Sequence, residues 1–339
     1  MTVKMLVFDV RESEKEFFKS DRFQNFDITF YNYCLNDETI KNLTREELDK
    51  TMVISVFLDS ELTEDVISAF KNLRIISTRS SSTDHINKNF AISKNIDVVN
   101  VEGYSSKTAA QFTIGLIIAL IRNLIPLSKF IESGEIIDYT GFDISNLTLG
   151  VIGTGLTGAC VCKIAHAFDM KVIAYDIKEK KELINNTDTQ YVELETLLKE
   201  ADIVTVHIPY SMENKNLISK RELDMMKESA YLINTSRAKV INIKDLYNAL
   251  KSKKIKGAAL DIKTCDSINP NCLKLQKSLG KNLECLDEMQ ILSELSKMPN
   301  VILTPQVAYK TYDVLEYIVE TTAKGILDCI QGGSKFKAC

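Results

Sequence analysis

Blocks of hydrophobic and polar residues alternate along the first hundred positions. Short runs rich in valine, isoleucine and phenylalanine predict strands at Val3–Asp9, Phe26–Tyr31, Met52–Phe57, Arg74–Thr78 and Asp97–Val101. Between these runs, polar segments such as Leu43–Lys50 and Thr63–Asn72 carry apolar residues at helical spacing. Strands that alternate with helices predict a parallel sheet covered by helices on its faces.

A second alternation of this kind begins at Thr148. Helices fit between its strands, for example at Gly155–Phe168 and Asn242–Ser252. Six strands in two βαβαβ halves are typical of a Rossmann-type, doubly wound, nucleotide-binding sheet. The predicted strands are Thr148–Ile152, Lys171–Tyr175, Ile203–His207, Ala230–Asn234, Gly257–Asp261 and Asn300–Thr304.

The two alternating regions are separated by a nearly all-apolar segment, Ser105–Arg122, which predicts a helix capped by Ser105 or Ser106. A helix that is apolar all round is buried, either in the core or at a subunit interface. We expect Pro126 to end or kink it. A different segment, Thr264–Leu286, is polar and without period, and predicts a long loop.

Length and composition narrow the classes of protein. A chain of 339 residues suggests two or three domains. Its 42 basic and 46 acidic residues give a net charge of −4, which argues against a nucleic-acid-binding face. The longest apolar run, Ile114–Ile121, is too short to span a membrane. The first residues lack the apolar core of a signal peptide, so we expect a cytoplasmic location.

Cysteines and histidines limit the possible chemistry. The eight cysteines form no CxxC pair and have no zinc-like spacing, so we expect no metal site. The chain has only three histidines, His85, His166 and His207, so any histidine-based mechanism must use one of them.

A glycine motif, Gly153-x-Gly155-x-x-Gly158, follows a predicted strand and opens a predicted helix. In this context the first glycine permits a tight turn, the second lets a pyrophosphate approach the backbone, and the third allows close packing. The intervening Thr154, Leu156 and Thr157 are therefore candidate cofactor contacts. The helix start supplies free N–H groups for the phosphates.

Asp176 ends the next predicted strand, 18 residues after Gly158. A carboxylate there can accept hydrogen bonds from both ribose hydroxyls and would repel a 2′-phosphate, which favours NAD over NADP. Lys178 and Lys180 lie nearby, so tolerance of NADP stays open.

Several further motifs occur in an order that resembles the D-2-hydroxyacid dehydrogenase family, and especially its D-lactate dehydrogenase branch. The motifs are TRSSSTDHIN (78–87), NVEGYSSKTAAQFT (100–113), TLGVIGTGLTG (148–158), ADIVTVHIPYSMENKNLI (201–218), LINTSRAKVIN (232–242), KGAALDI (256–262) and MPNVILTPQVAY (298–309). The resemblance extends over nearly the whole chain.

The resemblance implies two α/β domains with the substrate in the cleft between them. Residues 1–101 plus 303–339 would form a flavodoxin-like substrate-binding domain, and residues 102–302 the NAD-binding Rossmann domain. The helix at 105–122 resembles the dimer-contact helix of the family, which implies a homodimer. The implied partner is a small carboxylate-bearing substrate, with no nucleic acid and no membrane.

The family uses an Arg, a Glu and a His for catalysis, and only the Arg has a match. Arg237 in NTSRA corresponds to the Arg, whose planar fork suits a carboxylate or carbonyl. Thr264 stands at the Glu position, and Gln306 in TPQVA stands at the His position. Glutamine has no proton to give near neutral pH, so the usual general acid is absent.

The resemblance also implies the remaining contacts. Substrate contacts would come from Ser81, Ser82, which replaces a glycine of the family, and Tyr104. Further cofactor contacts would come from His207, Pro209, Thr235, Ser236 and Asp261.

Three functions remain open at this stage. The first is an NAD-dependent oxidoreductase whose proton comes from Tyr104, a lysine or water, or whose acceptor needs no strong acid. The second is a non-catalytic NAD(H)-binding sensor or partner-binding protein, because the Glu and His positions are lost together. The third is a thiol-dependent role for Cys265, Cys272 and Cys285.

Overall fold

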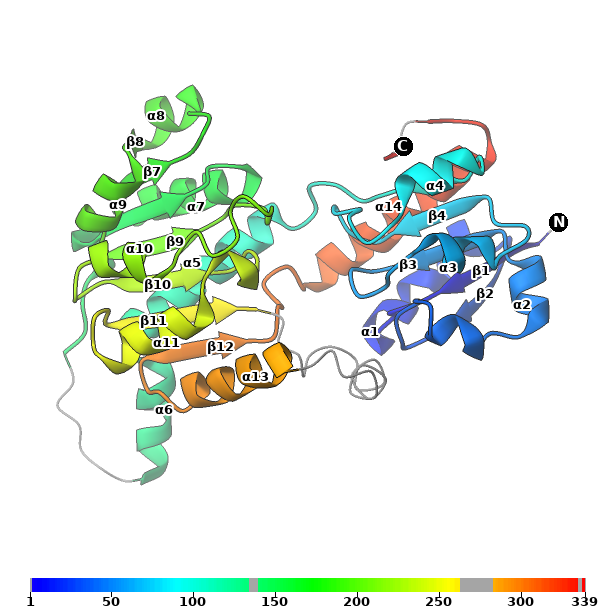
Figure 1. Cartoon of the computed structure of the whole chain (residues 1–339). Helices are drawn as coiled ribbons and strands as arrows, with labels where there is room; N and C mark the ends of the chain where they lie inside the picture. The colour runs from blue at the N-terminus through cyan, green and yellow to red at the C-terminus, as the bar shows by residue number, and fades with distance from the viewer. Residues whose placement is uncertain (1, 134–139, 263–282, 335–336, 339) are drawn as a thin grey trace. The chain divides into compact units, whose positions relative to one another are not determined.

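The computed structural model describes residues 2–133, 140–262, 283–334 and 337–338. The chain divides into two compact units (Figure 1). Unit 1 contains Met1–Tyr104 and Thr311–Cys339, and unit 2 contains Ser105–Ser267 and Lys281–Lys310. Most of the predicted loop at Thr264–Leu286 lies outside the described residues.

Unit 1 is built on a parallel sheet of five strands. In spatial order they are β2 (Phe26–Phe30), β1 (Val3–Val7), β3 (Val53–Val56), β4 (Ile75–Thr78) and β5 (Asp97–Val99). The order 2-1-3-4-5 is that of flavodoxin-like folds. All five strands predicted from the sequence are confirmed, and the structure trims one or two residues from several of their ends.

Helices cover both faces of the unit 1 sheet: α1 (Glu12–Lys15), α2 (Arg45–Lys50), α3 (Glu64–Ser68), α4 (Lys88–Ser93) and α14 (Tyr312–Ile330), with 3₁₀ turns η1 (Phe17–Lys19), η2 (Asp21–Phe23) and η3 (Thr39–Asn42). The long α14 returns from the end of the chain and packs Val319, Ala323 and Ile326 against Met5 and Val7 of β1. The C-terminal segment therefore completes the core of the N-terminal unit.

Unit 2 contains a parallel sheet of seven strands. Their spatial order is β12 (Val301–Thr304), β11 (Gly257–Asp261), β10 (Tyr231–Asn234), β9 (Ile203–Val206), β6 (Thr148–Ile152), β7 (Lys171–Tyr175) and β8 (Gln190–Tyr191). The six predicted strands are confirmed, and β8 was missed because two residues carry no readable pattern. The strand order reverses between β6 and β9, where doubly wound sheets bind their ligands.

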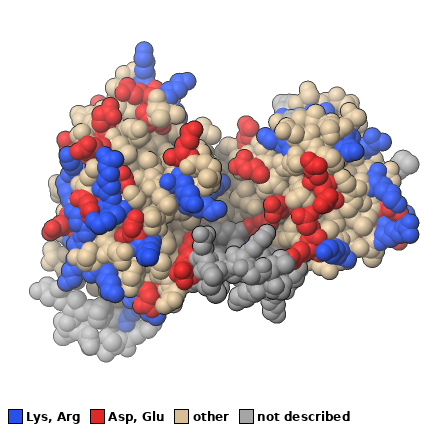
Figure 2. Space-filling view, viewed as in Figure 1, with Lys and Arg blue, Asp and Glu red and all other residues tan. Residues whose placement is uncertain are grey.

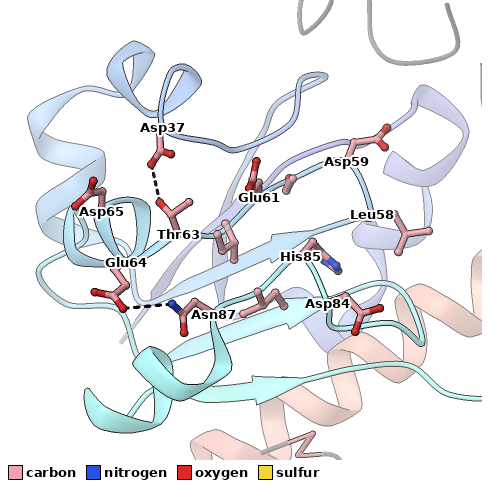
Figure 3. Close-up of a pocket in the computed structure, with 13 residues that line it drawn as sticks. Asp37, Leu58, Asp59, Glu61, Thr63, Glu64, Asp65, Asp84, His85 and Asn87 are labelled. Carbon is pink, nitrogen blue, oxygen red and sulfur yellow. Dashed lines mark hydrogen bonds between the residues drawn. The ribbon is translucent and has the colours of Figure 1, made fainter. Parts of the chain in front are cut away.

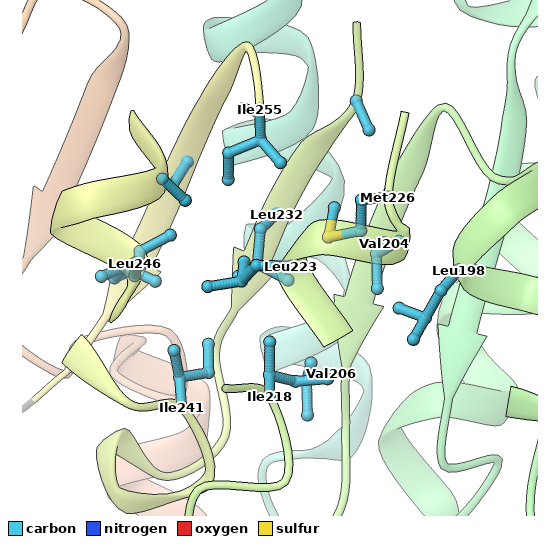
Figure 4. Packing of buried hydrophobic residues seen from close by; sticks show 14 of the residues in the cluster. Leu198, Val204, Val206, Ile218, Leu223, Met226, Leu232, Ile241, Leu246 and Ile255 are labelled. Atoms are coloured by element: carbon cyan, nitrogen blue, oxygen red, sulfur yellow. The ribbon is translucent and has the colours of Figure 1, made fainter. Parts of the chain in front are cut away.

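The helices of unit 2 are α5 (Ser106–Ile121), α6 (Leu124–Ser133), α7 (Leu156–Ala167), α8 (Lys181–Thr187), α9 (Leu194–Glu200), α10 (Lys220–Met225), α11 (Ile243–Lys251) and α13 (Leu283–Ser296), with 3₁₀ turns η4 (Ile144–Asn146) and η5 (Ala238–Val240). α5 and α7 share one hydrophobic cluster with the sheet. On the opposite face, Leu198, Leu223 and Leu246 of α9, α10 and α11 pack with Val204 and Leu232 (Figure 4). Burial on both faces explains why these strands are almost continuously apolar.

The structure differs from the sequence-based expectations for the apolar helix α5 and for Pro126, which was expected to end or kink it. α5 is not uniformly buried: Ile114 and Ile117 pack toward α7 and the sheet, whereas Gln111 and Gly115 are exposed. Packing within unit 2 thus explains most of its apolarity. The helix ends before Asn123, whose φ of +49° is left-handed. Pro126 lies instead in the first turn of α6, where its missing N–H has no intrahelical partner to lose.

The surface carries both signs of charge. Lysine and arginine side chains are interspersed with aspartate and glutamate on the faces of both units seen in Figure 2, in keeping with the small net charge of −4. Over the part of the chain that the structure describes, no helix combines the length and the apolar character needed to cross a membrane.

Candidate functional site

The glycine loop connects β6 to α7 at the carboxyl edge of the unit 2 sheet. Gly153 has a φ of +90°, and a Cβ atom there would lie 2.6 Å from Ile208 Cγ2 and 2.8 Å from the His207 carbonyl oxygen. A Cβ atom at Gly158 would lie 1.9 Å from the Gly153 carbonyl oxygen. At Gly155 a Cβ atom would meet nothing within 4 Å. The first and third glycines are therefore required by packing, while the second leaves its backbone open to a ligand.

The start of α7 forms the second part of this site. Its first turn, Leu156, Thr157 and Gly158, has backbone N–H groups without helical partners and the positive end of the helix dipole, which suit a phosphate. Three large apolar side chains of unit 2 follow the ends of β6, β7 and β9 and are strongly exposed: Leu156 (66%), Ile177 (98%) and Met212 (78%). Exposed apolar side chains at a strand edge are typical of a binding site for an apolar ring.

Asp176 directly follows β7 and reaches the glycine loop. Its Oδ2 accepts hydrogen bonds from the backbone N (2.6 Å) and Oγ1 (3.0 Å) of Thr154, and its Oδ1 accepts one from Lys178 N (2.9 Å). Burial acts to raise the pKa of Asp176, but these hydrogen bonds and the charge of Lys180 bring the pKa below its usual value. The group is an ionised, partly exposed carboxylate beside the phosphate-binding turn, which fits a ribose diol and opposes a 2′-phosphate.

His207 lies beneath the glycine loop, with its carbonyl oxygen against Gly153. Its ring is buried and its Nε2 lies 2.9 Å from Thr205 Oγ1, and burial lowers its pKa to about 4. Burial likewise lowers the pKa of His85, in unit 1, to about 4. His166 is exposed on α7. Neither His85 nor His207 is therefore an imidazolium at neutral pH.

The loop after β10 presents Thr235, Ser236 and Arg237. It is held by the buried Asn234, whose Oδ1 accepts hydrogen bonds from Ser236 N (2.9 Å) and Oγ (2.7 Å) and whose Nδ2 donates to the Arg237 carbonyl (3.0 Å). Thr235 Oγ1 lies 2.8 Å from Thr113 Oγ1 of α5. The backbone of Arg237 is thus fixed while its side chain is exposed. Asn234 was not among the predicted residues, although a polar residue at the end of an apolar strand is a usable signal.

The loop after β12 carries Gln306 and is braced by Asp261. The Asp261 carboxylate is 1% exposed and accepts hydrogen bonds from Thr304 Oγ1 (2.5 Å), Val307 N (2.9 Å) and Ala308 N (2.8 Å). Gln306 has a φ of +52°, a left-handed conformation that costs free energy for a residue other than glycine. Asp261 therefore holds the loop in a strained form that fixes the backbone of Gln306.

Pro209, a predicted cofactor contact, is exposed in the loop after β9. Thr264 lies outside the described residues, as do Cys265, Cys272 and the side chain of Cys285.

The predicted substrate contacts of unit 1 lie after β4 and β5. Ser81 Oγ donates to the Val101 carbonyl (3.0 Å), and Ser82 Oγ donates to Asp84 Oδ2 (2.8 Å). The backbone φ of Ser82 is not positive, so a serine fits where the family has a glycine. Tyr104 is partly buried and follows Gly103, whose φ is +69°.

Unit 1 also contains a hollow of about 860 Å³ that the sequence did not predict (Figure 3). Several of its carboxylates accept hydrogen bonds: Asp37 Oδ1 from Thr63 Oγ1 (2.6 Å), Glu64 Oε1 from Asn87 Nδ2 (3.4 Å), and Asp84 Oδ2 from Ser82 Oγ as described above. Such a negative lining would repel a substrate carboxylate. The lining carboxylates are Asp37, Asp59, Glu61, Glu64, Asp65 and Asp84.

A doubly wound sheet, a glycine turn that only glycine can form and an ionised carboxylate on the next strand define a dinucleotide-binding dehydrogenase domain. The model of the "D-isomer specific 2-hydroxyacid dehydrogenase, NAD binding domain" family matches residues 114–308. The chain belongs to this family, and its cofactor is NAD.

Relatives along nearly the whole chain agree with this assignment. A glyoxylate reductase of Thermofilum pendens is 31% identical over 85% of this chain and 82% of its own length. The D-lactate dehydrogenase of Aquifex aeolicus, solved with NAD and lactic acid, superposes with a TM-score of 0.82 at 31% identity, covering 97% of this chain and 96% of that one. D-2-hydroxyisocaproate dehydrogenase superposes with a TM-score of 0.80 at 25% identity, over 99% of both chains.

Proposed function

We propose that this protein is an NAD-dependent oxidoreductase that acts on a small 2-oxo or 2-hydroxy acid with an atypical proton donor. The observation that carries the proposal is the strained loop of Gln306. Hydrogen bonds to Asp261 hold this loop in place, although Gln306 has no acidic proton. Strain of this kind persists where the surrounding structure holds it, and it is concentrated at functional sites. The relatives named above, a glyoxylate reductase and a D-lactate dehydrogenase, support the substrate class.

Arg237 is the proposed anchor of the substrate. Its guanidinium, presented from a fixed backbone, can grip a carboxylate or carbonyl oxygen with two hydrogen bonds. The nicotinamide, when bound, supplies or accepts the hydride. Ser81, Ser82 and Tyr104 remain proposed contacts of the substrate carboxylate.

Gln306 takes the place of the general acid in this proposal. Its amide can donate a hydrogen bond to the reacting oxygen and stabilise developing negative charge, but it cannot release a proton. His85 and His207 are neutral at pH 7 because burial lowers the pKa of each to about 4. We therefore propose that water delivers the proton. Without a general acid, the rate falls by about 10²–10⁴ relative to a histidine-bearing relative.

The test restores the missing pair. NADH oxidation is measured across a panel of 2-oxo acids with the wild-type protein, Gln306→His, and the double variant Thr264→Glu with Gln306→His. We expect slow but real turnover by the wild type and a gain of about 10²–10⁴ in the double variant, with a new fall in rate as the pH rises past the histidine pKa. The single Gln306→His variant, which lacks the carboxylate partner, is the matched control and should gain less.

A second candidate is a protein that binds NAD(H) without turnover. It is favoured by the combination of a fully formed glycine loop with the loss of the Glu and His positions. It predicts micromolar NADH binding, no turnover on any substrate of the panel, and no rescue by the double variant. That set of results would replace the catalytic proposal with this one.

Oligomeric state is a separate part of the proposal. We propose a homodimer formed through the region of α5 and α6, because Leu124 (49% exposed), Ile125 (43%) and Phe142 (48%) leave apolar surface there. Sedimentation of the wild type against a Leu124→Glu, Ile125→Lys variant tests it. A wild-type monomer at micromolar concentration would exclude the dimer.

A further inference from the structure

The glycine loop of unit 2 contains no charged side chain. Residues 153–158 read GTGLTG, so the loop offers a phosphate neutral donors and the helix dipole but no full positive charge. A pyrophosphate carries two negative charges, and charge-assisted hydrogen bonds to phosphate are about twice as strong as neutral ones. A cation from another segment would complete the site.

Lys180 is the cation that reaches this loop. Its Nζ donates a hydrogen bond to the Gly155 carbonyl oxygen at 3.0 Å. Gly155 is the residue that caps α7, so the ammonium lies against the first turn of the helix whose N–H groups would receive the phosphates. Lys178, two residues earlier, differs: its backbone N–H serves Asp176, while its side chain is exposed.

A chain of hydrogen bonds fixes the backbone of Lys180 to the same loop. Lys180 N donates to Tyr191 Oη (3.0 Å), and Tyr191 Oη donates to Thr154 Oγ1 (2.9 Å). Thr154 Oγ1 in turn donates to Asp176 Oδ2 (3.0 Å). Each hydroxyl both accepts and donates, so every donor in the chain has one acceptor. Tyr191 on the short strand β8 thereby couples the position of Lys180 to that of the ribose-binding carboxylate.

We propose that Lys180 binds the pyrophosphate of NAD(H), and that Tyr191 is a positioning residue that holds Lys180 and Asp176 together. The side chain would exchange its bond to the Gly155 carbonyl for one to a phosphate oxygen, a short movement for a flexible four-carbon stem. The pyrophosphate is favoured over a 2′-phosphate because the ammonium lies on the phosphate-binding turn, while Asp176 occupies the ribose side and repels a further phosphate.

The inference rests on the dinucleotide site and not on turnover, so it is tested by binding alone. Dissociation constants of NADH, NADPH and ADP-ribose are measured by fluorescence or calorimetry, without substrate, at low and high NaCl. We expect Lys180→Gln to weaken NADH and ADP-ribose by about tenfold and to reduce the salt dependence. NADPH should weaken by the same factor as NADH. Lys180→Arg should keep most of the affinity, and Lys178→Gln, the matched control, should change little.

Three results would overturn the proposal. Unchanged NADH affinity in Lys180→Gln would remove the lysine from the site. A loss confined to NADPH would assign Lys180 to a 2′-phosphate instead. An equal loss in Lys178→Gln would reduce the effect to general electrostatic attraction.

Tyr191→Phe tests the positioning role separately. This variant loses the hydroxyl that joins Lys180 N to Thr154 and keeps the ring that packs in the core. We expect a smaller loss of NADH affinity than in Lys180→Gln, and no further loss when the two changes are combined. Fully additive losses would show that Tyr191 acts independently of Lys180. Thermal unfolding of each variant distinguishes lost binding from lost stability.

Discussion

Two loops of unit 2 are each held by an aspartate at the end of a parallel strand, and the two aspartates differ in exposure. Asp176, after β7, accepts hydrogen bonds from Thr154 of the glycine loop and stays partly exposed. Asp261, at the end of β11, accepts two hydrogen bonds from the loop of Gln306 and one from Thr304 at the end of β12, and is 1% exposed. The first carboxylate keeps capacity for a ligand, while the second is consumed by the protein.

The same two loops also differ in how they reach positive φ. Gly153 adopts +90° without penalty because it has no side chain, whereas Gln306 adopts +52° against a steric cost. The cofactor loop thus relies on residue type, and the Gln306 loop relies on the bonds of Asp261. We infer that the bonds of Asp261 hold this loop in place although Gln306 has no proton to donate.

Among changes to these two loops, we expect Gly158→Ala in the glycine loop to have the largest effect on NADH binding. Its Cβ atom would lie 1.9 Å from the Gly153 carbonyl oxygen, so the turn must move. We expect NADH affinity to fall by about a hundredfold or more and the melting temperature to drop. Titration with NADH and a thermal melt measure the two effects.

Two other glycines serve as controls for this change. Gly155→Ala meets no protein atom within 4 Å, so it should fold normally and lose NADH binding only through contact with the cofactor. Gly115→Ala, on the exposed side of α5, should leave NADH binding unchanged. Wild-type affinity in Gly158→Ala would contradict the close packing of the turn.

We expect acid to lower the free energy of unfolding through His207, which lies next to the glycine loop. Because its pKa in the folded state, about 4, lies below that of the unfolded chain, the neutral ring contributes fully above about pH 6.5. That contribution is lost as the pH falls from 6.5 toward 4, and we expect a decrease of a few kcal/mol in the free energy of unfolding. Urea unfolding of wild type and His207→Gln at several pH values isolates the effect. Parallel pH profiles for the two proteins would refute it.

A smaller effect is expected from Asp261→Asn. The amide would turn an N–H toward the N–H of Ala308 and leave a buried group unsatisfied, at a cost of about 1–3 kcal/mol. Turnover should fall because Gln306 shifts, while the dissociation constant of NADH stays constant. The matched variant Asp176→Asn should leave the free energy of unfolding nearly unchanged. It should instead change cofactor binding, by narrowing the preference for NADH over NADPH. A changed NADH affinity in Asp261→Asn would instead mean that Asp261 contacts the cofactor.

Local patterns in the sequence predict much of this candidate site. Gly153, Gly155, Gly158 and Asp176 follow strands at fixed spacing, so their roles can be predicted without coordinates. Tyr191 could not be found in this way, because the two-residue strand β8 has no periodic pattern. Lys180 was noticed only as a charge near Asp176, and its contact with Gly155 could not be predicted. Their hydrogen bonds to the glycine loop join segments that are 25 to 37 residues apart.

The sequence by itself determined the two parallel sheets and the glycine turn, because strand burial and backbone sterics are local properties of residue type. It also shows directly that position 306 is a glutamine and not a histidine. Only the tertiary structure decided which aspartate stays partly exposed beside the glycine loop and which is buried, and that burial keeps His85 and His207 neutral. Exposure and pKa depend on neighbours brought from distant segments, such as Val307 and Ala308 against Asp261. Such neighbours are fixed when the chain packs, and no single stretch of sequence encodes them.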